Sequence, residues 1–242
     1  MRKESNSPDS ERGMVLLKKA GILLAAVLLL TMQTLYFQKV CNRSRFRQTA
    51  GAASVAVERP KVALTFDDGP HPYLTDRLLD GLKERDTKAT FFMLGENVEG
   101  NEKTVKRVAA EGHLIGNHSY THPEFYTMNP DEICAEVSKT YNLVYELTGK
   151  ETEFVRPPYG EWKDSYGCSL DMIPVMWTID TEDWKTTNVD AIVNRVVNHV
   201  KENDIILMHD YYETSVTAAL RIVDYLKENG YDCVTVDEIV LD

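Results

Sequence analysis

The chain has little cysteine, proline and glycine, with 4 Cys, 9 Pro and 13 Gly among its 242 residues. This scarcity excludes a collagen-like or low-complexity chain. A hydrophobic fraction of 43% beside a charged fraction of 27% also excludes a chain that is mainly disordered. The length allows one sizeable core and is too short for two large domains with linkers, so we expect a single folded domain.

The cysteines are far apart and form no CxxC pair, so the sequence predicts neither a zinc ribbon nor a dithiol redox motif. A single disulfide and buried free thiols are both compatible with this spacing, and we favour free thiols. The four positions are Cys41, Cys134, Cys168 and Cys233.

Basic residues are scarce beyond the first fifty positions. Residues 1–50 hold nine Lys or Arg against three Asp or Glu, whereas residues 51–242 hold 18 against 35. An acidic domain of this kind repels phosphate backbones, so we expect no nucleic-acid partner. A neutral or cationic substrate fits this charge better, although solubility alone also accounts for an acidic surface.

One long stretch lacks charged residues, namely residues 20–37 (AGILLAAVLLLTMQTLYF). A helix of that length can just span a bilayer core of about 30 Å at about 1.5 Å per residue. A cleaved signal peptide is the alternative, because the strictly apolar residues 20–30 have the length of a signal h-region. The nearest small-residue site, Ala50 to Ala52, lies too far downstream for cleavage, so we expect an uncleaved membrane anchor.

This interpretation divides the chain into a cytoplasmic N-terminal segment (1–19), a transmembrane anchor or signal peptide (20–37), a linker (38–58) and a folded domain (59–242). Five basic residues precede the span and four follow it, so the positive-inside rule hardly distinguishes the two orientations. The expected extracytoplasmic location of the domain, secreted if the N-terminal segment is cleaved, therefore rests on its chemistry.

Short apolar runs alternate with amphipathic segments from residue 59 onward. Residues 62–66, 89–94 and 205–208 are rich in β-branched and aromatic residues and too short for helices, so they predict buried parallel strands. Apolar residues between them recur at helical spacing, and Gly112 and Gly230 are placed to end helices. This alternation predicts an α/β fold, either a doubly wound sheet or a (β/α) barrel with fewer than eight full units. The helical positions are Leu74, Leu78 and Leu82; Ile133, Val137, Tyr141 and Val144; Ile192, Val196 and Val200; and Ala219, Ile222, Val223 and Leu226.

Ionisable residues collect where the predicted strands end, which is the edge at which α/β folds place their active sites. Asp67 and Asp68 directly follow the first strand and precede a Gly69-Pro70 turn. One of the two carboxylates can bind a cation while the other acts as a base. A turn with two solvated carboxylates is the simpler interpretation of this motif alone.

His118 and His122 follow another apolar run, in the segment HSYTH. Their spacing of four predicts that both imidazoles lie on one side of a helical turn, where they can reach one divalent ion. Two imidazoles and one carboxylate form a common open site for catalytic zinc. Two surface histidines with this spacing by coincidence are the alternative.

Arg156 stands in the rigid segment RPPYG, where it can orient a carboxylate or form an ordinary structural ion pair with Asp183 or Glu161. His209 ends the strongest predicted strand, and a neighbouring carboxylate can fix its tautomer for acid–base catalysis. Three aromatic residues near these groups are typical either of a core or of a platform for sugar rings: Tyr159, Trp177 and Trp184.

Five segments in this order, TFDDGP, HSYTH, RPPYG, DTEDW and LMH, lie within residues 61–210 and together resemble the polysaccharide deacetylase family, carbohydrate esterase family four. Each motif alone is weak, but five in order at compatible spacing are specific. The resemblance implies a distorted (β/α) barrel and metal-dependent removal of acetyl groups from N-acetylated sugars. The segment 161–174, short and polar after the arginine motif, departs from the family and leaves the shape of the substrate groove open.

The resemblance also implies a metal site. Its ligands are expected to be Asp68, His118 and His122. Zinc suits two imidazoles and a carboxylate, and cobalt, nickel and iron also suit such a site.

Catalytic roles follow from the same resemblance. Asp67 resembles the catalytic base and Arg156 the residue that positions it. His209 resembles the catalytic acid, with Asp183 as the carboxylate that tunes it. The backbone N–H of Tyr159 is expected to contribute to an oxyanion hole. Two residues are expected to line the acetyl pocket: Trp184 and Leu207.

These features predict a membrane-anchored, outward-facing enzyme that removes N-acetyl groups from a polysaccharide containing N-acetylglucosamine. Peptidoglycan is the expected substrate, and a chitin-like oligosaccharide is related to it. An O-acetyl esterase for another polysaccharide is one alternative, because the same metal site accommodates it. A non-catalytic wall-binding module is another, but it requires a broken site, and the five motifs are complete.

Overall fold

The computed structural model describes residues 31–33, 59–163 and 171–241. The chain falls into two compact units, and the second, Glu58–Asp242, contains all the described strands. The expected N-terminal segment, anchor and linker lie outside the described residues, apart from the helical residues 31–33. No helix within the described ranges is both long and apolar enough to cross a membrane. The anchor over residues 20–37 therefore stays a prediction.

Eight described strands form one sheet, and every pair of neighbours is parallel. They are β1 (Lys61–Asp67), β2 (Thr90–Met93), β3 (Leu114–Asn117), β4 (Phe154–Val155), β5 (Ile173–Pro174), β6 (Ile179–Asp180), β7 (Asp204–His209) and β8 (Asp232–Val234). The main order is β5-β4-β3-β2-β1-β7-β6, and β8 pairs with the first half of β1. The three strands predicted from apolar runs correspond to β1, β2 and β7, and the expected parallel sheet is confirmed.

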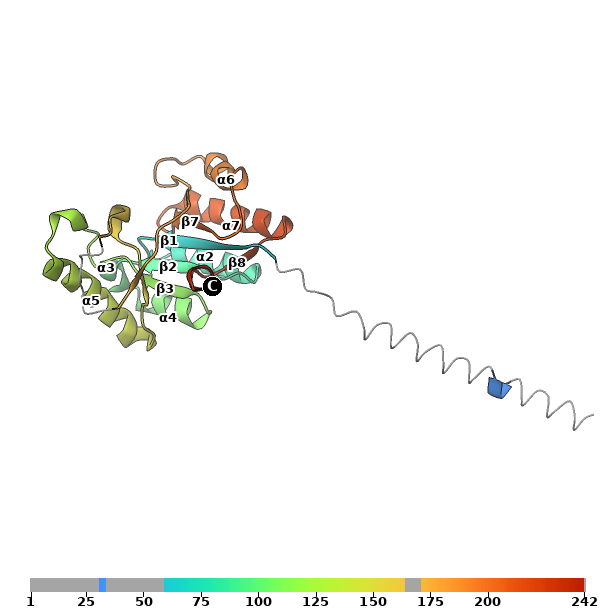
Figure 1. Cartoon of the computed structure of the whole chain (residues 1–242), viewed down its shortest axis with the longest axis horizontal. Helices are drawn as coiled ribbons and strands as arrows, with labels where there is room; N and C mark the ends of the chain where they lie inside the picture. The colour runs from blue at the N-terminus through green and yellow to red at the C-terminus, as the bar shows by residue number, and fades with distance from the viewer. Residues whose placement is uncertain (1–30, 34–58, 164–170, 242) are drawn as a thin grey trace, which may run out of the picture. The chain divides into compact units, whose positions relative to one another are not determined.

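The longer helices form one layer along this sheet. They are α2 (Leu74–Glu84), α4 (Glu102–Ala110), α5 (Pro130–Thr148), α6 (Val189–Val197) and α7 (Glu213–Glu228), with shorter α3 (Gly95–Val98) and α8 (Asp237–Val240) and the 3₁₀ turns η1 (Phe125–Thr127) and η2 (Pro158–Gly160). Within the layer, α6 packs on α7, α7 on α2, α2 on α4 and α4 on α5. In Figure 1, α6 and α7 lie on one side of β1, and α4 and α5 lie on the other.

This arrangement is a parallel α/β half-barrel and not a doubly wound sheet. The strand path ends at β5 and β6, which do not pair with each other within the described residues, so the barrel stays open there. The expected distorted barrel is therefore confirmed for the described unit.

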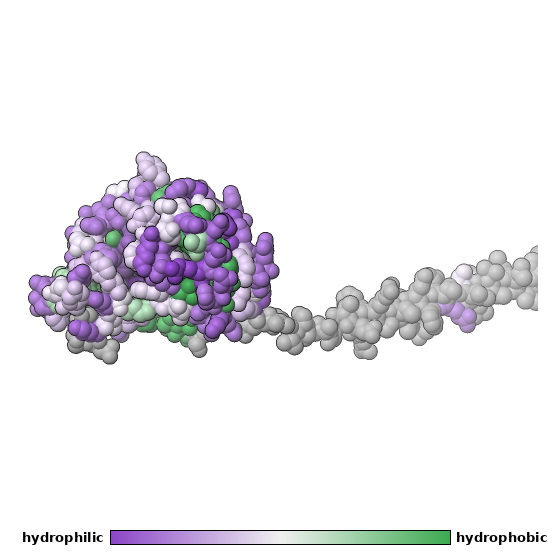
Figure 2. Space-filling view, turned by 90° about the horizontal axis from the view of Figure 1, so that it is seen from above, coloured by the Kyte–Doolittle hydropathy of each residue, from purple (hydrophilic) through white to green (hydrophobic). Residues whose placement is uncertain are grey.

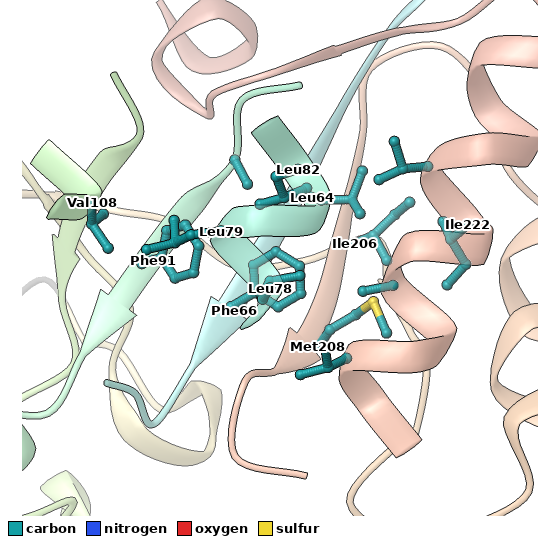
Figure 3. Close-up of a cluster of buried hydrophobic side chains, with 14 of the residues drawn as sticks. Leu64, Phe66, Leu78, Leu79, Leu82, Phe91, Val108, Ile206, Met208 and Ile222 are labelled. Carbon is teal, nitrogen blue, oxygen red and sulfur yellow. The ribbon is translucent and has the colours of Figure 1, made fainter. Parts of the chain in front are cut away.

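Alternation along β1 separates a core from a site. Val62, Leu64 and Phe66 face the helix layer and belong to the main hydrophobic cluster. Figure 3 shows Leu64 and Phe66 among apolar side chains of the covering helices and of β7. Burying such a side chain contributes about 1.5–3 kcal/mol. The intervening residues, Thr65 and Asp67, are buried on the opposite face, where the barrel interior lies.

The helical periodicities agree with the structure at most positions. Gly112 and Gly230 have φ of 82° and 84°, and each directly follows the C-cap residue of a helix, as predicted. The exception is Val200, because α6 ends at Val197. Val200 packs against the main cluster from outside the helix.

The surface agrees with the acidic composition. Figure 2 shows a face on which hydrophilic residues predominate and hydrophobic residues form only scattered patches. This is the pattern of a folded unit whose large apolar residues are used in its core.

The preference for free thiols is wrong for Cys134. This residue of α5 is bonded in a disulfide whose partner lies outside the described residues. Cys233 on β8 is a free thiol, and burial raises its pKa to about 11. Disulfide formation depends on which sulfur atoms the fold brings together, and spacing along the chain does not contain that information.

A buried histidine at the amino end of β3, away from the carboxyl ends of the strands, gives a prediction for stability. The Nδ1 atom of His113 accepts a hydrogen bond from the backbone N–H of Ala89 at 3.2 Å, and burial lowers the pKa of this imidazole from 6.5 to about 4. Protonation removes the acceptor. The contribution of His113 to the free energy of unfolding is therefore fully present above pH 6.5 and is lost as the pH falls toward 4. The loss amounts to at most about 3 kcal/mol.

Urea unfolding of the full-length protein at about pH 7 and about pH 4.5 measures this loss. His113→Asn places a non-titrating oxygen where it can accept the same hydrogen bond, so this variant should lose less stability on acidification than the wild type. Equal losses in the two proteins would contradict the assignment.

Candidate active site

The loops that follow β1, β3, β4, β6 and β7 meet at the carboxyl edge of the sheet. They surround an open cavity of about 370 Å³. All five motifs of the sequence contribute to its wall. The lining residues are Asp67, Asp68, His118, His122, Pro157, Tyr159, Trp177, Asp180, Trp184, Leu207 and His209.

A buried ion pair lies at the bottom of this cavity. The Nη1 atom of Arg156 is 2.8 Å from Oδ1 of Asp67 and also donates to the hydroxyl of Thr65 at 2.6 Å. The remaining guanidinium nitrogens donate to the carbonyl oxygens of Val175 and Met176. Burial raises the pKa of the Asp67 carboxyl, while the positive charge of Arg156 opposes that rise. The expected contact between Arg156 and Asp67 is therefore present.

Asp68, His118 and His122 converge beside this pair. The Oδ1 atom of Asp68 lies 3.5 Å from Nε2 of His118 and 3.6 Å from Nε2 of His122. One ligand atom from each residue lies within 4.8 Å of the others. In a tetrahedral zinc site with bonds of about 2.0–2.2 Å, ligand atoms are separated by about 3.3–3.6 Å. The two separations from Asp68 match that requirement.

The chemical state of these atoms also fits a metal. Oδ1 of Asp68 is buried and has no hydrogen-bond partner among the described residues. Nδ1 of His118 lies 2.6 Å from the carbonyl oxygen of Arg156, so it must donate there and leave the Nε2 lone pair directed at Asp68. Burial lowers the pKa of His118 to about 3, which keeps this imidazole neutral. The group therefore fits a divalent cation.

The two histidines do not lie on a helical turn, contrary to the expectation from their spacing. They lie in the loop after β3, where Ser119 and His122 adopt left-handed backbone conformations with φ of 68° and 58°. The side chain of Asn117 accepts a hydrogen bond from the backbone N–H of Ser119, and such a local bond competes with helix formation. The two rings still meet, with centroids 5.0 Å apart.

Helix α5 holds this loop through a residue that the sequence analysis missed. The carboxylate of Glu136 accepts hydrogen bonds from the backbone N–H groups of Tyr120 and Thr121, at 3.0 Å and 2.7 Å, and from the Thr121 hydroxyl. One turn further along α5, Thr140 donates to the carbonyl oxygen of Ser119 at 2.7 Å. Glu136 therefore fixes the segment between the two histidines. In the sequence, Glu136 is one glutamate on an amphipathic helix, and nothing in that pattern distinguishes it from other glutamates.

His209 and Asp183 form a second charged pair. Nδ1 of His209 lies 2.8 Å from Oδ1 of Asp183, and the backbone N–H of His209 donates to the other oxygen of this carboxylate. Burial alone would lower the pKa of His209. The hydrogen bond from His209 to Asp183 and the negative charge of Asp183 outweigh burial and raise the pKa to about 9. The negative charges of Asp67 and Asp68 add to this rise. Asp183 thus serves His209 and does not pair with Arg156.

The remaining expected site residues also line the cavity. Tyr159 has a left-handed backbone with φ of 59°, and its N–H makes no hydrogen bond within the described part of the chain. The Trp184 side chain is 50% exposed, whereas Leu207 is buried at the end of β7. These positions suit a backbone donor and an apolar wall around a small group.

Two further carboxylates were given no role by the sequence analysis. Asp180 lines the cavity and accepts a hydrogen bond from the backbone N–H of Glu182 at 2.8 Å. Asp210 is fully buried, and burial raises its pKa to about 7. It accepts a hydrogen bond from Thr75 and occupies space beside Gly69, where a Cβ atom would lie 2.3 Å from its Oδ1. Gly69 is therefore required by a close approach.

Comparison with known proteins places this site in a family. The family model for polysaccharide deacetylase matches residues 54–170. A peptidoglycan-N-acetylglucosamine deacetylase of Bacillus cereus is 40% identical over 77% of this chain and 70% of its own length. The chain belongs to the polysaccharide deacetylase family. The peptidoglycan-N-acetylmuramic acid deacetylase PdaC of Bacillus subtilis is 36% identical over 84% of this chain, which spans only 46% of the length of that relative.

Solved structures of family members share the half-barrel. The structure of PdaC is 38% identical with a TM-score of 0.73, and the match covers 75% of this chain and 90% of that one. A pseudoenzyme of carbohydrate esterase family 4 from Bacillus anthracis also matches, at 32% identity and a TM-score of 0.70 over 76% of this chain and 66% of its own. Membership in the family therefore does not by itself establish activity.

The contacts of Glu136 predict an effect on metal affinity. Glu136→Gln removes the negative charge that strengthens both backbone hydrogen bonds, and it places an amide NH₂ where the Thr121 hydroxyl now donates. The loop should then hold His118 and His122 less firmly, so zinc affinity should fall about 10–100-fold. Competition with a chromogenic zinc chelator on the full-length protein measures the dissociation constant.

Glu146→Gln is the matched control, because Glu146 is exposed on the same helix. Its zinc affinity should equal that of the wild type. Equal affinity in Glu136→Gln, with its folded circular dichroism spectrum retained, would show that the loop does not depend on this carboxylate.

Proposed function

We propose that this chain is a metal-dependent hydrolase that removes N-acetyl groups from a polysaccharide containing N-acetylglucosamine, with peptidoglycan as substrate. One observation carries the proposal: the candidate metal group lies in one cavity with two carboxylate–cation pairs, Asp67–Arg156 and Asp183–His209. A metal, a base and an acid around one small space are the parts that amide hydrolysis needs.

Asp68, His118 and His122 would hold the metal, with zinc as the proposed ion and cobalt, nickel or iron as alternatives of similar ligand preference. When bound, the ion supplies a Lewis acid that polarises the acetyl carbonyl and lowers the pKa of water.

The side chains of the chain account for the proton transfers. Asp67 accepts a proton from water as the water oxygen attacks the acetyl carbon, and Arg156 holds that carboxylate in place. The N–H of Tyr159, which makes no hydrogen bond among the described residues, is available to the oxyanion of the tetrahedral intermediate. His209, protonated through its pairing with Asp183, donates its proton to the departing nitrogen as the carbon–nitrogen bond breaks. Acetate and a free amine leave, Asp67 returns its proton to solvent, and His209 takes up a proton from solvent.

The proposed substrate is based on the names of relatives. The names of the two Bacillus relatives assign the acetyl group to N-acetylglucosamine in one and to N-acetylmuramic acid in the other, both in peptidoglycan. An O-acetyl esterase is the alternative that the same site accommodates. A non-catalytic wall-binding module is the other alternative, since a pseudoenzyme shares the fold. Asp67 and His209 both line the cavity, and each is paired with its expected partner, Arg156 or Asp183, which favours an active enzyme.

We also propose that residues 20–37 anchor the protein in the cell membrane with the catalytic unit on the extracytoplasmic side. The proposal is supported by the uncharged stretch in the sequence and by the location of a wall polymer outside the membrane. Protease protection in intact cells tests the orientation.

Acetate release by the full-length, zinc-loaded protein tests the reaction. Peptidoglycan, chitooligosaccharides and acetylated xylan form the substrate panel. We expect release from the N-acetylated polymers, and a fall of about 10²–10⁴-fold in both Asp67→Asn and His209→Ala, because each removes a general acid–base step. Release from xylan alone would favour the esterase, and no release with zinc bound would favour the binding module.

The pairing of His209 with Asp183 predicts a dependence on pH. The acid acts in its protonated form, so activity should fall as the pH rises through the pKa of about 9. Asp183→Asn removes the charge that raises this pKa, which should return to roughly 6.5 or below. The alkaline limb of the kcat profile should therefore move down by about two pH units or more. An unmoved alkaline limb would assign the proton donor to another group.

A further inference from the structure

A row of aromatic side chains leads away from the candidate active site. It comprises His71 and Tyr73 from the loop after β1 and Tyr211 and Tyr212 from the loop after β7. We call these four residues the aromatic row. The proposed reaction uses none of them, and no motif of the sequence analysis includes them.

The row is continuous with the site. The ring of Tyr212 lies 6.5 Å from that of His209, between centroids, and 6.0 Å from Tyr211. Tyr211 lies 5.1 Å from His71, which lies 6.3 Å from Tyr73. Each ring thus contacts the next, and the row begins at the proposed catalytic acid.

The three tyrosines of the row are exposed to solvent. Tyr73, Tyr211 and Tyr212 are 78%, 46% and 42% exposed, although tyrosine normally buries much of its ring. Interplanar angles along the row are 56–85°, so no ring stacks face to face with its neighbour. Within the described part of the chain, the three tyrosine hydroxyls make no hydrogen bond. Exposed aromatic surface and hydroxyl groups are therefore both available to a ligand.

The row is held in position by its surroundings. Nδ1 of His71 accepts hydrogen bonds from the backbone N–H groups of Tyr73 and Leu74, each at 3.2 Å, which fixes the loop after β1. An ion pair between Arg77 and Glu213 joins the first turns of α2 and α7 beside the row. This support reduces the entropy that a ligand must remove on binding.

These properties select the class of ligand. Aromatic faces carry negative charge density and attract the weakly positive C–H groups of a flat apolar surface. A pyranose ring offers such C–H faces together with hydroxyl groups at its edge. We infer that the aromatic row binds pyranose rings of the polysaccharide strand beyond the sugar that is deacetylated. The inference rests on the proposed function for the identity of that strand.

Calorimetric titration of zinc-free, full-length protein tests this inference without turnover. The probes are the dimer and the hexamer of N-acetylglucosamine. In Tyr73→Ala and Tyr211→Ala we expect the dissociation constant for the hexamer to rise about 5- to 10-fold, as for one aromatic anchor. The constant for the dimer, too short to extend along the row, should not change. Tyr212 is left intact because it contacts the proposed catalytic acid.

Tyr145→Ala is the control, since Tyr145 is a 48% exposed tyrosine on α5, where it stacks on Tyr141. Both of its dissociation constants should match the wild type. Wild-type affinity for the hexamer in both row variants would overturn the inference, as would equal losses for dimer and hexamer. In a third titration, with a peptide-bearing peptidoglycan fragment, a loss seen only with that fragment would assign the row to peptide and also overturn the inference.

Acetate release, measured in parallel, separates the two claims. Row-dependent binding of the hexamer without acetate release would support the row and reject the proposed reaction. Acetate release together with hexamer binding that does not depend on the row would support the proposed reaction and reject the role of the row.

Discussion

The buried ion pair between Arg156 and Asp67 is the interaction on which the rest of the site depends. Burying a guanidinium and a carboxylate is costly unless each is paired and hydrogen-bonded, and here the guanidinium donates to β1 and to the segment between β5 and β6. The carbonyl oxygen of Arg156 also accepts from His118. One residue therefore fixes the proposed base, the half-barrel interior and the orientation of a metal ligand.

The partners in the two carboxylate–cation pairs shift pKa values in opposite directions: Arg156 lowers the pKa of Asp67, whereas Asp183 raises the pKa of His209. Burial raises the pKa of Asp67 despite Arg156, which makes this carboxylate a better base. Asp183 raises the pKa of His209 to about 9, which keeps the imidazole protonated near neutral pH. Arg156 opposes protonation of Asp67 and Asp183 opposes deprotonation of His209, so each partner favours the charged state that the proposed reaction starts from.

Prediction from sequence succeeded where local chemistry determines structure. The apolar runs of β1 and β7 predict that Asp67 and His209 lie at strand ends. The order of the five motifs predicts that their loops share one site. It failed where tertiary contacts decide. The histidine pair lies in a loop because Asn117 bonds to the Ser119 backbone, and Glu136 acts on that loop from a helix. The disulfide of Cys134 likewise depends on spatial proximity.

Backbone strain is concentrated at the same place. Seven described residues other than glycine have positive φ, and five of them lie in the loops around the cavity: Asp68, Ser119, His122, Tyr159 and Glu182. Such conformations cost on the order of 1 kcal/mol or more each and persist only when their surroundings hold them. Asn97 donates to the carbonyl of Asp68, Ser119 accepts from the His122 N–H, and Asp180 accepts from the Glu182 N–H. Stability in the core thus maintains loops that would not adopt these shapes alone, and this is why a site built from five short segments can be rigid enough for catalysis.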